Sequence, residues 1–400
     1  LGLFVYAARE MATLEYAGLV YATSMAQIIV QLSSLGWLNL IRRESSRFDL
    51  YELGHIKGFV LRSFQIPLFV LSTVLFFAGI FLFNDIFPAS LSEAIFYCLM
   101  MTCPLLLVSV FREYLAGFGR PAMSVFTSET MPLLLSLVSF FIFKINGVKD
   151  AVIYLIICQL VGVVVQVVIL APQFLQYLSV KDSIYETVRW ARIAGFTVVG
   201  YGGKLLMDRM DILLIAPLAG MSQLAIFNST SRISAVILLV PLVLIQFFAP
   251  RIGKLFGHQN TVGLKSEIFL QIKLISLALL PIVLFMVIYS DQVMVWVFGA
   301  KYIEGADILW LSILANVMFA YALPFSSLLI MTDGERPYAI CSLLGLLVYV
   351  SIGLLLIPTK GIHGASVAMV LATGTMSAGC VPCEADCCVN WHVKSRPVKS

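Results

Sequence analysis

Five charged side chains lie within two strongly apolar segments of this sequence. Lys204, Asp208, Arg209 and Asp211 fall in one segment, and Arg232 falls in the next. A charge held at the depth of a bilayer costs roughly 2.5 to 3.5 kcal/mol, so it persists only where it is paired or faces water. The five residues are therefore the first candidates for a functional site.

The spacing of these residues brings most of them onto one helix face. Lys204, Asp208 and Asp211 follow one another at intervals of four and three residues, with Arg209 turned by about 100° from Asp208. Counted from the turn that joins the two segments, Asp208 and Arg232 reach similar depths. A salt bridge from Asp208 or Asp211 to Arg232 would fasten the two helices together. That pairing leaves two cations, Lys204 and Arg209, over.

Besides a structural salt bridge between the two helices, the charged cluster has two functional interpretations. Arg232, Lys204 and Arg209 could line a water-filled cavity and hold an anionic group such as phosphate through charge-assisted hydrogen bonds. The acids Asp208 and Asp211 could instead take up a coupling proton or Na⁺. Glu129, in a polar stretch of an earlier apolar segment, is a further candidate for the cavity. These roles remain open alternatives for the cluster at this point.

The composition indicates an integral membrane protein. Of the 400 residues 60% are hydrophobic and 12% are charged, and the mean hydropathy is +0.97, whereas soluble domains carry about 25% charged residues. The lipid bilayer is thus the main partner, and no basic, aromatic-interleaved patch suggests nucleic acid. The sequence has no phosphate-binding loop, hydrolase triad or metalloprotease helix in a supporting context. We expect a non-enzyme without cofactor, driven by an ion or substrate gradient.

Apolar segments of about 20 residues, the length of a membrane-spanning helix, recur along nearly the whole chain. They predict an all-α polytopic fold of about twelve helices in two sets of six, the first helix being a stub. The first set is expected at residues 1–8, 17–41, 59–83, 93–115, 123–143 and 151–170, and the second at 193–218, 223–249, 267–289, 306–331, 338–357 and 364–379.

Four regions follow from these segments. We expect an N-terminal bundle at residues 1–171, a polar cytoplasmic linker at 172–192, a C-terminal bundle at 193–379 and a Cys-rich tail at 380–400. The tail contains a C-x-x-C followed by further Cys and His, which are ligand types for zinc, but its spacing is not that of a standard finger. No metal site is predicted, and the last helix is expected to end at Gly379.

Lys and Arg alternate between rich and poor loops. The second, fourth, sixth and eighth loops are rich, whereas the odd loops carry few or none. Because cytoplasmic loops retain Lys and Arg, the even loops and both termini are expected on the cytoplasmic side.

Short motifs punctuate the apolar segments at Ala8 to Leu19, Leu115 to Arg120, Met210 to Gly220 with Ile226 to Ile233, Val297 to Tyr302, and Ile357 to Ala368. These stretches resemble motifs of the polysaccharide-flippase branch, the Wzx-type transporters, of the multidrug/oligosaccharidyl-lipid/polysaccharide exporter superfamily. Their order and spacing cover almost the whole chain.

The resemblance implies two six-helix bundles around a central cavity in the bacterial inner membrane. It also implies that an undecaprenyl-pyrophosphate-linked oligosaccharide passes from the inner to the outer leaflet for O-antigen or exopolysaccharide export, with polysaccharide polymerase and glycosyltransferases as possible partners. Arg232, Lys204 and Arg209 would then face the pyrophosphate, and Asp208, Asp211 and Glu129 would be salt-bridge partners or ion-coupling groups. An ion-coupled multidrug exporter of the same fold and a polymerase-type membrane enzyme are the alternatives.

Overall fold

The chain forms two helical units in a computed structural model. The structure describes residues 2–45, 48, 52–83, 89–145, 147–180, 183–191, 194, 209–257, 260–331 and 335–394, the last fifteen of these by their backbone alone. All regular elements within these ranges are helices, as the sequence predicts. The first unit comprises Leu1–Gly202 and the second Gly203–Ser400.

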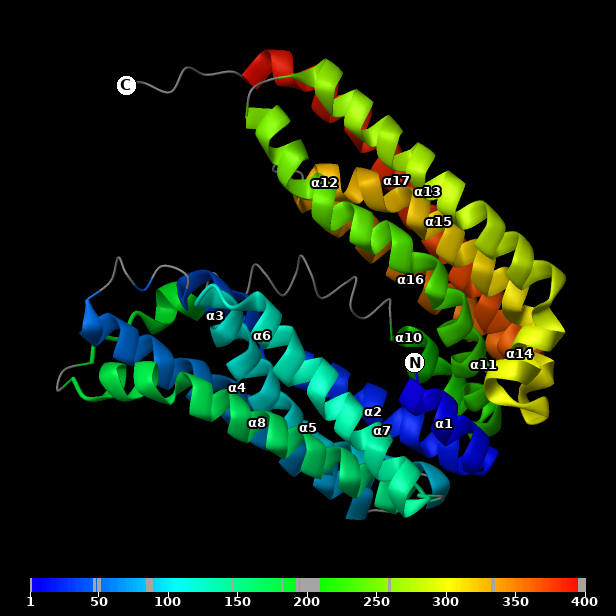
Figure 1. Ribbon diagram of the computed structural model, residues 1–400, viewed down its shortest axis with the longest axis horizontal. Helices are drawn as coiled ribbons and strands as arrows, with labels where there is room; N and C mark the ends of the chain where they lie inside the picture. Colours follow the sequence, from blue (N-terminus) through cyan, green and yellow to red (C-terminus); the bar gives the residue numbers. More distant parts are fainter. Residues whose placement is uncertain are drawn as a thin grey trace. The chain divides into compact units, whose positions relative to one another are not determined.

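The first unit is built around α5, which packs against α2, α3, α4, α6 and α8. Its elements, blue to green in Figure 1, are α1 (Gly2–Glu10), α2 (Thr13–Ser33), α3 (Trp37–Ser45), α4 (Leu53–Phe83), α5 (Ala89–Gly117), α6 (Pro121–Val125), the π-helix η2 (Phe126–Thr130), α7 (Met131–Phe143) and α8 (Val148–Leu178). The central helix α5 therefore joins the early elements of this unit to α8.

The single span predicted at residues 17–41 is wrong, because the helix breaks between α2 and α3. Leu35 and Gly36 take left-handed conformations, with φ of 45° and 77°, and glycine adopts such angles without steric cost. The break turns α3 so that Trp37, 1% exposed, enters the aromatic core of the unit. There Phe59 packs edge-on against Trp190 at 5.2 Å between ring centroids. α3 thereby carries its charged end to the end of α5.

The second unit has α15 at its centre, in contact with α11, α12, α13 and α17. Its elements are α10 (Met210–Ala219), α11 (Met221–Ser234), the 3-10 helix η3 (Ala235–Leu238), α12 (Leu239–Gly257), α13 (Thr261–Ile288), α14 (Ser290–Phe298), the 3-10 helix η4 (Ala300–Gly305), α15 (Ala306–Met331), α16 (Glu335–Lys360) and α17 (Ile362–Lys394). α15 has the bounds that its apolar run predicts.

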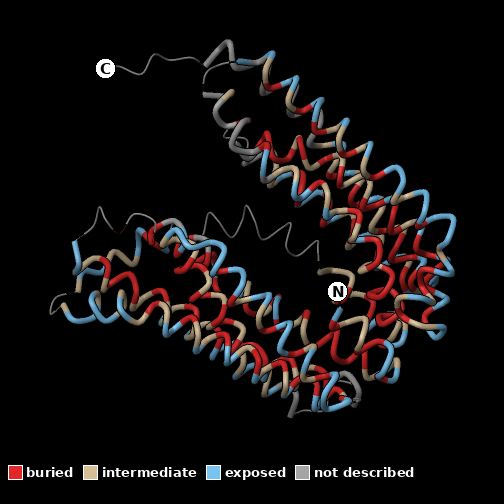
Figure 2. Tube along the Cα trace, in the orientation of Figure 1, coloured by how far each residue is buried: buried red, intermediate tan, exposed pale blue. Residues whose placement is uncertain are grey.

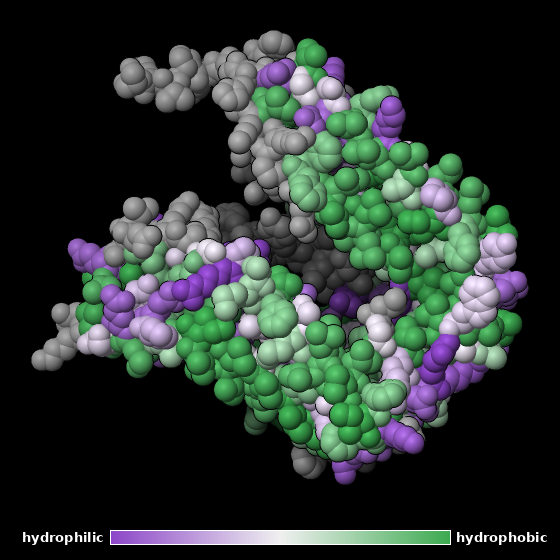
Figure 3. All heavy atoms as spheres, viewed as in Figure 1, coloured by the Kyte–Doolittle hydropathy of each residue, from purple (hydrophilic) through white to green (hydrophobic). Residues whose placement is uncertain are grey.

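Apolar side chains cover the outside of both units. Eight helices of the described chain are long and apolar enough to cross a membrane. In the span Leu53–Ile80 only 17% of the most apolar window is buried, and Phe69 is 72% exposed. Figure 2 shows the buried residues inside each unit, and Figure 3 shows hydrophobic atoms over much of the visible outer faces. Such surfaces suit hydrocarbon, which is as apolar as a leucine side chain.

Three predicted helix ends lie too early in the sequence. α12 continues through Pro250 to Gly257, past the end expected at residue 249. α8 continues through Pro172 to Leu178, into the segment expected as a linker. α17 continues past Gly379 to Lys394 and so includes the backbone of the Cys-rich segment. One proline removes a single backbone donor, which a helix can accommodate by a local bend. The seventh span was predicted at residues 193–218. Within it the structure describes the helix α10, which begins at Met210.

Three predicted outer loops meet at one end of the second unit. Gln223, Asp307 and His363, which lie close to the seventh, ninth and eleventh loops, line one open pocket of about 580 Å³. Loops that lie at the same end of one helical unit lie on the same side of the membrane. The alternation of Lys and Arg likewise requires the odd loops to share one side.

The orientation itself is a testable expectation. In a cysteine-free background, single cysteines at residues 301–305 should react with a membrane-impermeant maleimide added to intact cells. Cysteines at residues 254–265 should react only after the membrane is opened. The opposite pattern would reverse the predicted orientation.

Candidate functional site

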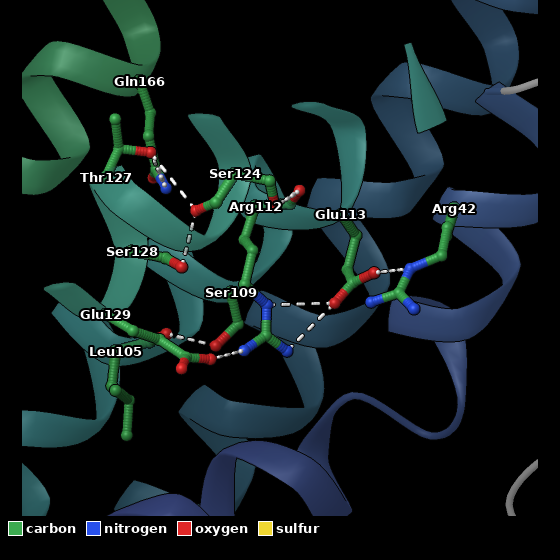
Figure 4. A network of polar contacts seen from close by, with 10 residues as sticks. All are labelled: Arg42, Leu105, Ser109, Arg112, Glu113, Ser124, Thr127, Ser128, Glu129 and Gln166. Carbon is green, nitrogen blue, oxygen red and sulfur yellow. Dashed lines mark hydrogen bonds and ion pairs between the residues drawn. The ribbon is translucent and has the colours of Figure 1, made fainter. Parts of the chain in front are cut away.

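The first unit joins four charged side chains from three separate parts of the chain. Arg42 lies on α3, Arg112 and Glu113 lie near the end of α5, and Glu129 lies in η2 (Figure 4). Arg42 Nε donates to Glu113 Oε2 at 2.6 Å. Arg112 donates from Nε and Nη2 to Glu113 Oε1 at 3.1 and 2.9 Å and from Nη1 to Glu129 Oε1 at 3.0 Å. One chain of ion pairs thus ties α3, α5 and η2 together.

Glu113 is the buried centre of this network. Its side chain is 2% exposed, whereas those of Arg42 and Glu129 are 57% and 56% exposed. A carboxylate without water needs hydrogen bonds and an opposite charge, and two arginines supply both. We conclude that Glu113 anchors the network, while Glu129 forms its exposed end.

The network lies beside a widened helical turn. η2 is a π-helix, an arrangement that is rare and often found at functional sites. Gln166 of α8 donates from Nε2 to Thr127 Oγ1 at 3.2 Å, and Thr127 Oγ1 donates to Met123 O at 2.8 Å. Gly162 of α8 allows the close approach, because a Cβ there would lie 2.9 Å from Thr127 O. α8 therefore supports the turn that holds Glu129.

Replacement of Gly162 by alanine is expected to destabilise the first unit by about 1 to 3 kcal/mol, because the added methyl group meets a backbone oxygen that cannot move alone. Thermal unfolding of the purified protein in detergent measures the loss. Gly79→Ala on α4 is the matched control, since a Cβ there meets no atom within 4 Å. An equal loss in both variants would contradict the close approach of α8.

The structure describes three of the five residues in the cluster predicted on the second unit. Lys204 and Asp208 lie outside the described residues, so the predicted pair between Asp208 and Arg232 stays a prediction. Arg209 stands directly before α10, and Asp211 lies in its first turn, where Oδ1 accepts a hydrogen bond from Ile212 N at 2.9 Å. A carboxylate in the first turn of a helix also interacts favourably with the helix dipole.

Arg232 is held by an amide on its own helix. Its Nε donates to Asn228 Oδ1 at 2.7 Å, across one turn of α11, and the Arg232 side chain is half-buried. Asn228 is 6% exposed. The structure thus shows that Asn228 orients the Arg232 guanidinium.

The start of α10 packs against α16. Tyr349 of α16 lies in a cluster with Met210 and Leu214 of α10, and its ring is 2% exposed. Among the residues that the structure describes, none forms a hydrogen bond with the buried Tyr349 hydroxyl, which lies within electrostatic reach of Asp211. Tyr349 was missed from sequence because an isolated tyrosine in an apolar segment carries no signal of its neighbours.

Sequence comparisons and structure comparisons give different results for this chain. No protein-family model matches the sequence, and no curated protein sequence matches it significantly. Among solved structures, an inward-facing multidrug resistance MATE family transporter of the MOP superfamily superposes with a TM-score of 0.79 at 15% identity, covering 98% of this chain and 95% of that chain. Fold similarity therefore extends beyond detectable sequence similarity.

Two further structures have the same fold. The lipid II flippase MurJ, in an inward closed conformation, gives a TM-score of 0.69 at 12% identity over 99% of this chain and 86% of that chain. The Vibrio cholerae MATE transporter VcmN in the bent form gives 0.60 at 13% identity over 98% and 96%. The chain thus has the polytopic helical fold of MATE transporters and of MurJ. At such low identities the likeness shows the fold, and the polysaccharide branch remains a prediction.

Proposed function

We propose that the chain is a flippase. Its substrate is a polyprenyl-pyrophosphate-linked oligosaccharide, which it carries from the cytoplasmic to the outer leaflet of the bacterial plasma membrane by alternating access. The oligosaccharide would be a repeat unit of O-antigen or exopolysaccharide, made by glycosyltransferases and joined by a polymerase. The fold, shared with drug exporters and a lipid II flippase, is compatible with this role.

The position of Arg232 carries the proposal. Arg232 follows Met221, where its span begins, by eleven residues, or about 16 Å along the helix axis. That distance is about half the thickness of the hydrocarbon core. Asn228 fixes the guanidinium through one hydrogen bond, and a guanidinium presents five donors in a planar fork that suits phosphate oxygens. An arginine kept at this depth supports an anionic substrate.

The other predicted residues take roles around Arg232 in this proposal. Lys204 and Arg209 add positive charge for the pyrophosphate. Asp208, Asp211 and Glu129 balance the cations or couple transport to an ion. These assignments rest on the spacing of the residues in the sequence.

A second candidate function is ion-coupled export of cationic drugs. Asp211 and the buried Tyr349 hydroxyl favour it, because a carboxylate and a hydroxyl are oxygen ligands that a coupling Na⁺ or proton could use. The third alternative, a polymerase-type enzyme, is the least favoured, since the folds found are those of transporters and a flippase.

Binding of a polyprenyl pyrophosphate and binding of a lipophilic cation to the purified protein separate the two leading candidates. A polyprenyl pyrophosphate should raise the unfolding temperature of the full chain in detergent, and a neutral polyprenol of the same length should not. The shift should disappear at high salt, because it depends on an ionic contact. Stabilisation by a lipophilic cation, with none by the pyrophosphate, would reject the flippase in favour of the drug exporter.

A further inference from the structure

The pocket of about 580 Å³ at the end of the second unit has charges of opposite sign on two of its walls. The acidic wall consists of Glu304, near the end of η4, and Asp307, in the first turn of α15. The basic wall consists of Lys360, at the end of α16, and His363, at the start of α17. The volume lies in the range of roughly 300 to 1,000 Å³ that is usual for small-molecule sites. The pocket is therefore large enough for a ligand that contacts both walls.

The charged side chains of the two walls do not pair with each other. Within the described ranges, no opposite charge lies within 4.0 Å of any of the four, and none of them forms a side-chain hydrogen bond. All four are exposed, so their charged ends are accessible from the pocket. Because the pocket keeps the acids and the bases apart, a ligand that carries both charges can bridge the two walls.

The pocket lies at the level of the lipid headgroups. Asp307 precedes Leu329, where its candidate span ends, by 22 residues, and Lys360 follows Tyr338, where its span begins, by the same number. At about 1.5 Å per residue these 22 residues measure about 33 Å, slightly more than the hydrocarbon core of about 30 Å. Both walls therefore stand where the hydrocarbon ends, on the side predicted to be the outer one.

Hydrogen bonds hold the backbone of both walls in place. At the acidic wall, Thr230 Oγ1 of α11 lies 3.2 Å from Gly305 O, within hydrogen-bond distance, and Thr230 is buried. At the basic wall, Gly361 N donates to Ile357 O at 2.9 Å and closes the turn between α16 and α17. The pocket is thus largely formed before a ligand binds.

The remaining lining of the pocket is mostly apolar. Ile357 and Ile362 line it as buried side chains, and Leu218 and Pro358 line it as exposed ones. Apolar surface next to a charged pocket at this depth suits a charged headgroup with hydrocarbon attached. A lipid therefore fits the lining better than a small ion does.

We propose that this pocket binds the zwitterionic headgroup of a phospholipid of the phosphatidylethanolamine class. The primary ammonium donates to Glu304 and Asp307, and the amide oxygen of Gln223, which also lines the pocket, is the acceptor for its third N–H. The phosphate accepts hydrogen bonds from Lys360 and His363. Phosphatidylglycerol has no cation for the acidic wall, and the trimethylammonium of phosphatidylcholine has no hydrogen-bond donor. The site is independent of the transported substrate.

Native mass spectrometry of the detergent-purified full chain tests the site with three lipids that have the same acyl chains. Phosphatidylethanolamine should bind about tenfold more tightly than phosphatidylcholine, the effect of a charge-assisted hydrogen bond that a trimethylammonium cannot form. It should also bind more tightly than phosphatidylglycerol, which the two carboxylates repel. Equal binding of the three lipids, or a preference for phosphatidylglycerol, would overturn the proposal.

Substitutions in the two walls should have different effects. Asp307→Asn should remove most of the preference for phosphatidylethanolamine over phosphatidylcholine, because the acidic wall distinguishes the two ammonium groups. Lys360→Gln should weaken the binding of both lipids and keep the preference, since both carry the same phosphate. Asp291→Asn, which changes an exposed carboxylate of α14 outside the pocket, is the matched control and should bind the lipids as the wild type does.

A soluble headgroup distinguishes a lipid site from a site for a dissolved zwitterion. Glycerophosphoethanolamine has the same charges but no acyl chains, so an equimolar amount should not displace bound phosphatidylethanolamine. Displacement would assign the pocket to a dissolved zwitterion and contradict lipid binding. An unchanged lipid preference in Asp307→Asn, or equal effects of Asp307→Asn and Asp291→Asn, would reject the acidic wall as the ammonium site.

Discussion

Arg232→Ala is expected to abolish export of the surface polysaccharide while the protein remains folded in the membrane. The substitution removes the cation proposed to hold the pyrophosphate at mid-depth. Charge-assisted hydrogen bonds contribute about 1.5 to 3 kcal/mol each, so the loss of one weakens binding at least tenfold. The measurement is surface polysaccharide in cells whose only copy of the transporter is the variant, with membrane protein levels measured in parallel.

Two matched variants test whether the loss of export in Arg232→Ala is due to the guanidinium at this position. Arg232→Lys keeps the charge but not the planar fork, so export should be reduced and not abolished. Arg189→Ala removes an arginine that is 57% exposed and paired with Glu186 at 2.7 Å, and export should remain near normal. Normal surface polysaccharide in the Arg232→Ala strain would sink the proposed role of this residue.

Glu113→Ala is expected to lower the stability of the protein by about 3 kcal/mol. Removing one member of a buried ion pair typically costs about 3 to 5 kcal/mol, because the partner charge is left uncompensated. The lower end applies because Arg42 and Arg112 remain 57% and 30% exposed. Both arginines lose their shared acceptor, and α3 loses its ionic link to α5. Thermal unfolding in detergent and the amount of folded protein in the membrane measure the effect.

Glu129→Gln is the control at the other end of the same network. Glu129 is 56% exposed and pairs with Arg112, and exposed ion pairs contribute about 0 to 1 kcal/mol. Its unfolding temperature should therefore stay close to that of the wild type. Equal destabilisation by the two variants would show that burial of Glu113 does not determine the strength of the network.

The membrane-spanning helices could be predicted because each leaves a long apolar run in the sequence. α15 has the predicted bounds, 306–331, since charged or turn-forming residues stand at both ends of its run. Helix ends marked only by a proline or a cysteine were placed too early, as in α8 and α17. The break at Leu35 and Gly36 was missed because it interrupts an apolar run without a charge.

The polar sites could be predicted only in part. Arg112 with Glu113, Glu129 and Arg232 are charges in or beside apolar segments, which makes each of them visible in the sequence. The pairing of Arg42 with Glu113 joins residues 71 positions apart, so it depends on how α3 and α5 pack. The placement of Tyr349 near Asp211 depends in the same way on α16 and α10. Local sequence reveals which charges need partners, and tertiary packing determines the partners.

Transbilayer movement of the substrate in reconstituted vesicles tests the central claim most directly. A fluorescent polyprenyl-pyrophosphate oligosaccharide is placed in the outer leaflet of vesicles that contain the purified protein, and a membrane-impermeant reductant quenches the label that remains outside. A protected fraction should appear over time with the wild type, and Arg232→Ala should be indistinguishable from protein-free vesicles. Equal protection in wild-type and protein-free vesicles, with active uptake of a lipophilic cation in the same vesicles, would contradict the flippase and identify a drug exporter.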